Sequence, residues 1–345
     1  MNNEQIKAIV LAAGKGTRMK SDRAKVLHEV FFAPMLHHVV NAIVPLDLLE
    51  IVVVTGHQAE VVEKSMAGFA VSFARQEQQL GTADAVAAAE AGLAEFKGTV
   101  LILCGDTPLV RTKTLRSMLD AHRAARAVLT VMTTRMTDPA NYGRIVTDEQ
   151  GALLRIVEEK DASVTEKSIN EINAGIYCVD SAFLFKGLRK IGSDNRQGEF
   201  YLTDLIEIAR SEELAVNRHF CEESLEVLGI NSRVELAEAH GVLQKRRNHH
   251  LMMAGVTIIG PDSVDIAPDV GVGSDCEIGR NVVISGCSVI GRDCRIGANT
   301  VIRNGRLGDG AVVGALCSLE NCTVDKGASL DSATIISGDR QGFKS

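Results

Sequence analysis

The residues best suited to chemistry lie in a glycine-containing loop near the N-terminus. The segment Leu11–Met19 follows an apolar run and carries Gly14 and Gly16. Glycines just past a buried strand let backbone N–H groups turn inward and bind a phosphate chain. Arg18 and Lys25 add two cations near this loop, a combination that suits a triphosphate. The loop is neither a dinucleotide fingerprint, since Met19 replaces the third glycine, nor a P-loop, since no Gly-Lys-Ser/Thr follows.

Two polar residues further along the chain extend this candidate site. Asp106 ends an apolar run, where an open parallel sheet presents its ligands, so its carboxylate could hold Mg²⁺. An aspartate in this place more often caps a turn or a helix, and the residues alone leave both readings open. The amide of Gln76 can both donate and accept hydrogen bonds.

The elements that must position these residues alternate along residues 1–231. Apolar strand-like runs lie at 8–11, 51–54, 71–73, 100–104, 128–133 and 175–179, with helical patterns between them, for example 83–94 and 114–125. This alternation predicts an α/β domain with a mostly parallel sheet and helices on both faces. Residues 142–160 are predicted as an antiparallel hairpin insertion. A helix over 232–255 follows, because Ser232 and Glu235 form a capping box and Gly255 is a plausible stop.

The last third of the chain repeats every six residues. The aliphatic positions are Ile266, Val272, Ile278, Ile284, Ile290, Ile296 and Ile302, then Leu307, Val313 and Leu319 after a slip of one, and Val324, Leu330 and Ile336 after another. A small or β-branched residue stands four positions after most of these aliphatic residues. Examples are Cys276, Cys294, Cys317 and Thr323, and Arg306 is the exception. This period predicts a hexapeptide β-helix over 256–337, whose narrow interior requires small side chains. Residues 338–345 are expected to form a polar tail.

Composition excludes several classes of protein. The 345 residues are 46% hydrophobic and 23% charged, as in soluble globular proteins and unlike disordered chains. A net charge of −7 and only 4% aromatic residues argue against nucleic acid as a partner. Eight cysteines without a Cys-x-x-Cys pair predict reduced thiols, and neither a signal peptide nor a membrane-spanning stretch is recognisable. We therefore expect a cytoplasmic protein without a membrane partner.

In their order along the chain, these motifs resemble those of the sugar nucleotidyltransferases. More narrowly, the chain is similar to the pyrophosphorylase half of the bacterial bifunctional UDP-N-acetylglucosamine pyrophosphorylase/glucosamine-1-phosphate acetyltransferases. The resemblance covers about residues 6–255. Besides 11–19, the matching segments are 25–28, 76 with 79–82, 104–109, 142–144, 157–161, 171–173, 197–202 and 229–231.

The resemblance implies a Rossmann-like sugar nucleotidyltransferase domain over 1–231, a linker helix over 232–255 and a short left-handed parallel β-helix. It implies in-line attack by N-acetylglucosamine 1-phosphate on the α-phosphorus of UTP, with Mg²⁺ as the cofactor. Asp106 and Asn231 would hold the metal, and Arg18 and Lys25 would be catalytic. The implied substrate-binding residues are Leu11, Ala12, Gly14, Gly16, Gln76, Gly81, Thr82, Gly143, Glu158, Asn173 and Asn231. Among them, Gln76 would offer a donor and an acceptor to the edge of a pyrimidine.

The chain departs from this family in three places. Ala24 replaces a usual proline before Lys25, so the lysine could be held less rigidly, and Cys104 stands where some relatives have tyrosine. The repeats end near Ile336, and the basic residues and histidine of the acetyltransferase have no counterparts. We therefore expect the acetyltransferase half to be absent and the β-helix to assemble the chain into a homotrimer.

Two alternative functions stay open. The first is a nucleotidyltransferase that uses another sugar 1-phosphate with UTP or dTTP. The second is a catalytically weak regulatory protein that binds a UDP-sugar without turnover. The presence of Arg18, Lys25, Asp106 and Asn231 speaks against the second alternative.

Overall fold

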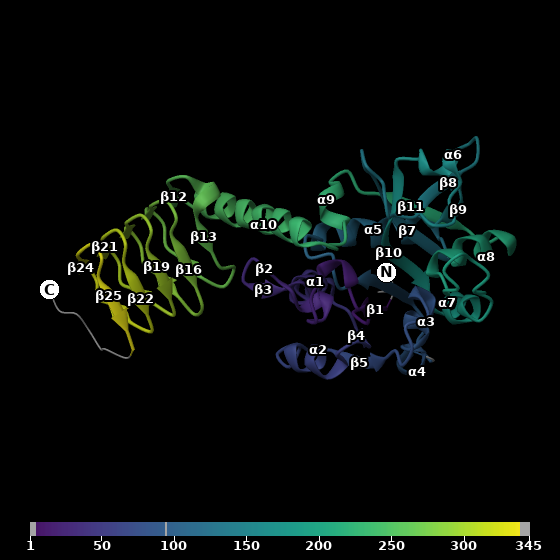
Figure 1. Cartoon of the computed structure of the whole chain (residues 1–345), viewed down its shortest axis with the longest axis horizontal. Coiled ribbons are helices and arrows are strands. Elements are labelled where there is room, and N and C mark those ends of the chain that lie inside the picture. Colours follow the sequence, from purple (N-terminus) through teal and green to yellow (C-terminus); the bar gives the residue numbers. More distant parts are fainter. Residues whose placement is uncertain (1–4, 94, 339–345) are drawn as a thin grey trace. The chain divides into compact units, whose positions relative to one another are not determined.

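A computed structural model describes residues 5–93 and 95–338, which divide into two compact units. The first contains residues up to Glu29 and Ala33–Glu235, and the second contains Val30–Phe32 and the residues from Leu236 onward. Figure 1 labels the helices and strands of both units. The predicted tail lies outside the described residues from position 339 onward, as does residue 94 at the end of a predicted helical segment.

A sheet of nine strands, counted over the described residues, organises the first unit. Its strands are β1 (Ile6–Leu11), β4 (Glu50–Thr55), β5 (Ser72–Arg75), β6 (Thr99–Cys104), β7 (Leu129–Arg135), β8 (Arg144–Thr147), β9 (Leu153–Val157), β10 (Glu171–Asp180) and β11 (Val216–Phe220). The main path runs β11-β7-β10-β6-β1-β4-β5. β10 is antiparallel to both of its neighbours on this path, while the other neighbouring pairs are parallel, which confirms the expected mostly parallel sheet. β8 and β9 pair antiparallel, as predicted for the hairpin.

Helices cover both faces of this sheet because successive strand residues point in opposite directions. In β1, Ala8 and Val10 belong to one buried cluster and Ile9 to the other. The first cluster includes residues of α1 (Met35–Ile43), α2 (Ala59–Ser65) and α5 (Thr112–Ala125), and the second includes residues of α3 (Thr82–Ala87), α4 (Glu90–Leu93), α7 (Ser181–Leu188) and α8 (Leu205–Ser211). The helix predicted over 83–94 is thus two short helices, and no proline or glycine marks the break between them.

Shorter elements connect these helices and strands. They are α6 (Val164–Lys167), α9 (Ser224–Val227), the hairpin strands β2 (Glu29–Val30) and β3 (Ala33–Pro34), and the 3₁₀ turns η1 (Thr17–Met19), η2 (Lys25–Leu27), η3 (Val44–Leu46) and η4 (Leu202–Asp204). Leu11 at the end of β1 lies beside Val54 of β4 and Cys104 of β6. The carboxyl ends of three parallel strands therefore meet at one edge, where an open sheet of this kind binds its ligands.

The helix α10 (Arg233–Met253) lies close to the predicted helix, and from Leu236 onward it belongs to the second unit. The hydroxyl of Ser232 accepts from the N–H of Glu235 at 3.2 Å, and Gly255 has φ +90°. The 3₁₀ turn η5 (Pro261–Ser263) and short strands follow: β12 (Thr257–Ile258), β13 (Asp265–Ile266), β14 (Gly271–Val272), β15 (Glu277–Ile278), β16 (Val283–Ser285), β17 (Val289–Ile290), β18 (Arg295–Ile296), β19 (Val301–Arg303), β20 (Arg306–Leu307), β21 (Val312–Val313), β22 (Ser318–Glu320), β23 (Thr323–Val324), β24 (Ser329–Leu330) and β25 (Ile335–Ser337).

Within the described residues, these strands form three parallel sheets, ordered β12-β15-β18-β21-β24, β13-β16-β19-β22-β25 and β14-β17-β20-β23. This arrangement and the buried aliphatic positions confirm the expected left-handed parallel β-helix. Cys276, Cys294 and Cys317 are buried, as expected for small interior residues. Their thiols lie within hydrogen-bonding distance of backbone carbonyls of the following coil, Cys276 at 3.0 Å from the oxygen of Gly291.

The slips in the repeat have a structural cause. Val283 pairs with Val301, whereas Val301 pairs with Ser318, so the later coils are one residue shorter. One residue is missing from the corner before β20 and another from the corner before β23. The interior position therefore falls on Gly305 and Cys322, which are buried, and Arg306 is exposed. The prediction that Thr323 points inward is wrong for the same reason.

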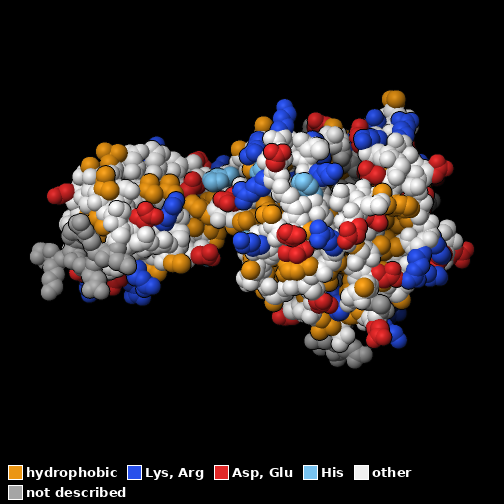
Figure 2. Space-filling view, turned by 60° about the horizontal axis from the view of Figure 1, so that its bottom comes forward, with side chains coloured by type: hydrophobic (Ala, Val, Ile, Leu, Met, Phe, Trp, Pro, Cys, Tyr) orange, Lys and Arg blue, Asp and Glu red, His pale blue; other side chains and the backbone are white. Residues whose placement is uncertain are grey.

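The surface carries charges of both signs. On the face shown in Figure 2, Lys and Arg side chains lie among Asp and Glu side chains. Aliphatic side chains are exposed on the β-helix strands at Val289, Val301, Val312 and Ile335. Over the residues that the structure describes, no helix has both the length and the apolar character needed to span a membrane.

Candidate active site

The loop after β1 is shaped by Gly16. This residue has φ +63°, in the left-handed region that favours glycine. A Cβ at Gly16 would lie 2.5 Å from the Cβ of Lys25, so the lysine stem passes directly against the loop. Gly14 differs, because a Cβ there would meet no described heavy atom within 4 Å. Gly16 is thus required by the position of Lys25.

Four polar side chains from distant parts of the chain meet beside this loop. The ammonium of Lys25 donates to Oδ2 of Asp106 and, at 2.6 Å, to Oδ1 of Asn231. Nη2 of Arg18 donates to the same Asn231 oxygen at 2.9 Å. The Lys25 and Asp106 side chains are only 13% and 20% exposed, so this ion pair is partly shielded from water. The structure therefore brings together the residues predicted for catalysis and for metal binding.

The oxygens of Asp106 and Asn231 form a donor set suited to a hard cation. Both contact one ammonium group, so they converge on a single point where positive charge is stabilised. Carboxylate and amide oxygens are the ligands that Mg²⁺ prefers. Among the described residues, no group of three or more His, Cys, Asp or Glu side chains could hold a metal ion, so a cation here would need further oxygens from water or a bound substrate.

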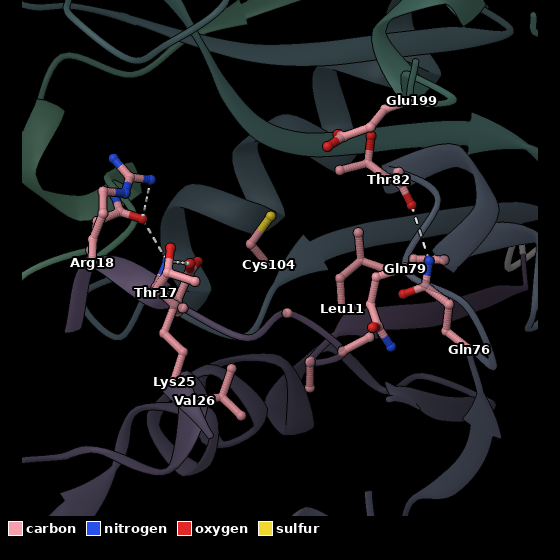
Figure 3. A pocket seen from close by; sticks show the side chains of 18 residues that line it. Leu11, Thr17, Arg18, Lys25, Val26, Gln76, Gln79, Thr82, Cys104 and Glu199 are labelled. Atoms are coloured by element: carbon pink, nitrogen blue, oxygen red, sulfur yellow. Dashed lines mark hydrogen bonds and ion pairs between the residues drawn. The ribbon is translucent and has the colours of Figure 1, made fainter. Parts of the chain in front are cut away.

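A pocket of about 410 Å³ extends from this cluster along the end of the sheet. Figure 3 shows Arg18 and Lys25 at one end, Gln76 and Thr82 at the other, and Cys104 between them. The predicted residues that line it are Leu11, Ala12, Gly14, Gly16, Arg18, Lys25, Gln76, Gly81, Thr82, Asp106 and Asn231. Thr17, Gln79, Ala85 and Glu199 also line it, although the sequence analysis assigned them no role. Gln79 and Glu199 lie inside two segments that match the family, 79–82 and 197–202, and this match was the sequence signal that could have identified them.

Gln76 is buried, with 5% of its surface exposed, and its amide is already engaged. Nε2 donates to Oδ2 of Asp84 at 2.7 Å and to the carbonyl oxygen of Gly81 at 3.2 Å. A side-chain amide has only two N–H donors. The structure thus differs from the expectation that Gln76 offers a base both a donor and an acceptor, because only the acceptor is left.

Gly81 is required by the backbone of a neighbouring loop. It has φ +129°, and a Cβ there would lie 2.4 Å from the carbonyl oxygen of Phe200. The hydroxyl of Thr82 accepts from the N–H of Leu202 at 3.0 Å, which fastens the start of α3 to the same loop. The close approach of the Phe200 backbone therefore explains why residue 81 is a glycine, whether or not a ligand binds beside it.

Gly143, Glu158 and Asn173 form a second group, outside the residues that line this pocket. The N–H of Asn173 donates to the carbonyl of Gly143 at 2.9 Å, and a Cβ on Gly143 would lie 3.4 Å from Oε1 of Glu158. Oε1 of Glu158 accepts from the hydroxyl of Thr203 at 3.2 Å, and burial raises the pKa of this carboxyl. Nδ2 of Asn173 donates to the hydroxyl of Tyr177 at 2.7 Å. The structure therefore brings together the three residues predicted for the sugar.

The two departures near the loop have distinct consequences. Ala24 is buried, and its N–H donates to Oε1 of Gln58 at 2.8 Å, a bond that proline could not make. This bond anchors the chain just before Lys25. Burial raises the pKa of Cys104 to about 12, so its thiol is neutral and unreactive at physiological pH.

Comparisons with known proteins give matches in both units of the chain. The nucleotidyl transferase family matches residues 7–223, and the bacterial transferase hexapeptide family (six repeats) matches residues 269–304. A putative glucose-1-phosphate thymidylyltransferase from Bacillus anthracis has a similar fold, with a TM-score of 0.55 and 22% identity over 69% of this chain and 94% of that one. The expected absence of the acetyltransferase half is not confirmed, because a hexapeptide region is present.

Two curated relatives match nearly the whole chain. The bifunctional protein GlmU of Desulfotalea psychrophila is 46% identical over 92% of this chain and 93% of its own length. The protein of the same name from Geobacter metallireducens is 45% identical over 95% of this chain, which spans only 63% of that relative. These matches confirm the expected enzyme class, a nucleotidyltransferase of the UDP-N-acetylglucosamine pyrophosphorylase type. The chain therefore belongs to the nucleotidyl transferase family and, within it, to the family of the bifunctional protein GlmU.

Proposed function

We propose that the chain transfers a uridylyl group from UTP to N-acetylglucosamine 1-phosphate and releases pyrophosphate. The observation that carries this proposal is the meeting of Arg18, Lys25, Asp106 and Asn231 at one end of a pocket whose other end holds Gln76. A phosphate oxygen of the sugar 1-phosphate attacks the α-phosphorus as the bond to the bridging α–β oxygen breaks. Pyrophosphate leaves with that electron pair, and the ionised attacking oxygen needs no general base.

In this reaction the chain's main task is to align two polyanions that repel each other. Arg18 and Lys25 would bind the phosphates of UTP and neutralise charge that develops on the leaving pyrophosphate. Asp106 and Asn231 would hold a divalent cation, for which we propose Mg²⁺, and the cation when bound would supply further neutralisation of the phosphates. Because Lys25 is only 13% exposed, its charge acts in a partly desolvated site and is weakly screened.

The second group would recognise the sugar. Glu158 and Asn173 offer polar atoms suited to the hydroxyls and the acetamido group. Gly143 lets the backbone pass close to both Ile156 and Glu158, because a Cβ there would lie 2.8 Å from Cγ2 of Ile156. Glu158 is partly buried, and a hydrogen bond to a ligand is stronger in such a partly desolvated place than in water. These roles agree with those that the family resemblance implies.

The test is pyrophosphate release from UTP with and without Mg²⁺. N-acetylglucosamine 1-phosphate is compared with glucose and N-acetylgalactosamine 1-phosphates under the same conditions. Clear preference for the first sugar supports the proposal, and preference for another would replace the substrate within the same class. Absence of turnover, together with tight UDP-sugar binding without metal, would favour the regulatory alternative.

The β-helix would assemble the enzyme into a homotrimer. Each of its three sheets carries exposed aliphatic side chains that could make such contacts: Val289 on one, Val301 and Ile335 on the second, and Val312 on the third. Light scattering at micromolar concentration measures the assembly directly. A monomer under these conditions would contradict this part of the proposal.

A further inference from the structure

The orientation of the Gln76 amide is determined by the atoms around its nitrogen. Nε2 faces Oδ2 of Asp84 and the carbonyl oxygen of Gly81, at 2.7 Å and 3.2 Å. If the amide turned over, its own carbonyl oxygen would face a carboxylate and a carbonyl without a proton between them. Three acceptors in contact repel one another, so the chemistry permits one orientation. Both N–H donors are then used within the protein.

Asp84 is well placed to impose this orientation. It lies in the first turn of α3, and its carboxylate reaches the side chain of Gln76, just past β5. The backbone of Gln76 is held in turn by a hydrogen bond from its N–H to the carbonyl of Thr55 at 2.8 Å. Because Gln76 is 5% exposed, water cannot readily replace these partners. An ionised carboxylate only accepts hydrogen bonds, so Asp84 admits the N–H side of the amide alone.

We propose that Asp84 is a positioning residue that makes Gln76 an obligatory hydrogen-bond acceptor and so selects the base of the nucleotide. The inference rests on the proposed function. In Figure 3 the Gln76 nitrogen is turned toward the backbone near Thr82 and its oxygen toward the Leu11 side of the pocket. An acceptor in this place matches a pyrimidine that carries an N–H at ring position 3, as uracil does. Cytosine has a lone pair at that position and would be repelled.

The residue acts through Gln76 and need not touch the nucleotide. Asp84 does not line the pocket, whereas Gln76 and Gly81 do. Gly81 contributes its acceptor through the backbone, which substitution does not remove. Asp84 is therefore the partner whose chemistry a mutation can change without reshaping the pocket.

The experiment compares the affinity of the full chain for UTP and CTP by calorimetry, in the presence of Mg²⁺ and without a sugar phosphate. Asp84→Asn keeps the size of the side chain but allows its new amide to turn its NH₂ group toward Gln76. With only the Gly81 carbonyl left to favour the first orientation, the Gln76 amide can then turn over and present its own N–H to the base. We expect the UTP-to-CTP affinity ratio to fall about tenfold, as a charge-assisted hydrogen bond gives way to a neutral one. The melting temperature should be unchanged.

Glu77→Gln is the matched control. Glu77 is exposed in the same turn, lines the depression outside Gln76 and makes no described contact with its side chain. Like Asp84→Asn, this variant removes one negative charge from the surroundings of Gln76. A general electrostatic effect on nucleotide binding would therefore appear in both Asp84→Asn and Glu77→Gln. We expect the UTP-to-CTP ratio of Glu77→Gln to match that of the unmodified chain.

Three results would overturn the inference. An unchanged ratio in Asp84→Asn would show that the carboxylate does not set the acceptor. Equal weakening of both nucleotides with a lower melting temperature would show a purely structural role. A tenfold fall in both variants would assign the effect to charge. If the unmodified chain shows no preference for UTP, the proposed uridylyl transfer itself fails, and that outcome is distinguishable from the other three.

Discussion

Substitution of Gly16 by alanine tests how the loop positions Lys25. At φ +63° a residue with a side chain is disfavoured by about 1 kcal/mol. The new Cβ would also lie 2.5 Å from Cβ and 2.9 Å from Cγ of Lys25, closer than carbon atoms can approach. Overpacking of this kind destabilises a protein by about 1–3 kcal/mol. We therefore expect the free energy of unfolding to fall by about 2–4 kcal/mol.

The same substitution should impair turnover through Lys25. To relieve the overlap, the lysine stem must move, which separates its ammonium from Asp106 and Asn231. Loss of one group that stabilises developing charge lowers kcat by about 10²–10³-fold. If displacement of Lys25 is the cause, Gly16→Ala combined with Lys25→Met should lose little more activity than Lys25→Met alone.

Urea unfolding and steady-state kinetics measure both effects, with Gly14→Ala as the stability control. A Cβ on Gly14 meets no described atom within 4 Å, and its φ lies outside the left-handed region. Its free energy of unfolding should therefore stay within about 0.5 kcal/mol of the unmodified chain. Equal destabilisation by the two alanines, or full additivity of Gly16→Ala and Lys25→Met in kcat, would refute the reasoning.

Three further predictions concern catalysis, pH and the β-helix. Asp106→Ala should lower kcat by orders of magnitude in a chain that still folds, beside the exposed control Asp120→Ala. Near-normal turnover in saturating Mg²⁺ would exclude the metal role. Burial, with smaller contributions from nearby carboxylates, raises the pKa of Asp204 from 3.8 to about 6. The folded state therefore binds this proton more tightly than the unfolded state does. The resulting stabilisation is lost as the pH rises between these two values. Asp204→Asn should thus gain about 1 kcal/mol at pH 7.5, allowing for solvent screening, and almost nothing at pH 3.5, as thermal melts at both pH values would show. Leu316, in the coil after that of Asn299, has φ +62°, and its side chain is 61% exposed. Because asparagine tolerates this backbone conformation better than leucine, Leu316→Asn should stabilise the β-helix by about 1 kcal/mol, as measured by urea unfolding. Equal destabilisation by Leu316→Asn and the strand variant Val312→Asn would contradict this prediction.

The parts of the fold that could be predicted from sequence are those with a periodic pattern. A parallel strand buried on both faces appears as a continuous apolar run, which is why the runs at 8–11 and 51–54 identified β1 and β4. The β-helix was recognisable because its aliphatic positions recur at a fixed step. The period could not show where each coil is shortened, since a slip between Ile302 and Leu307 fits several corner geometries. Thr323 was consequently assigned the interior place that Cys322 occupies.

The candidate site was harder to predict because its interactions join residues far apart in sequence. Lys25 and Asp106 could each be placed near the end of an element, but no pattern showed that the ammonium contacts both oxygens expected to hold a cation. That contact connects two roles which the sequence analysis treated separately. Asp106 and Asn231 cannot hold Lys25 and a metal ion at the same point, so a cation bound there would free the ammonium for the phosphates. Lys25 thus stabilises both oxygens, and under the proposed function it would become available to the phosphates once a cation binds.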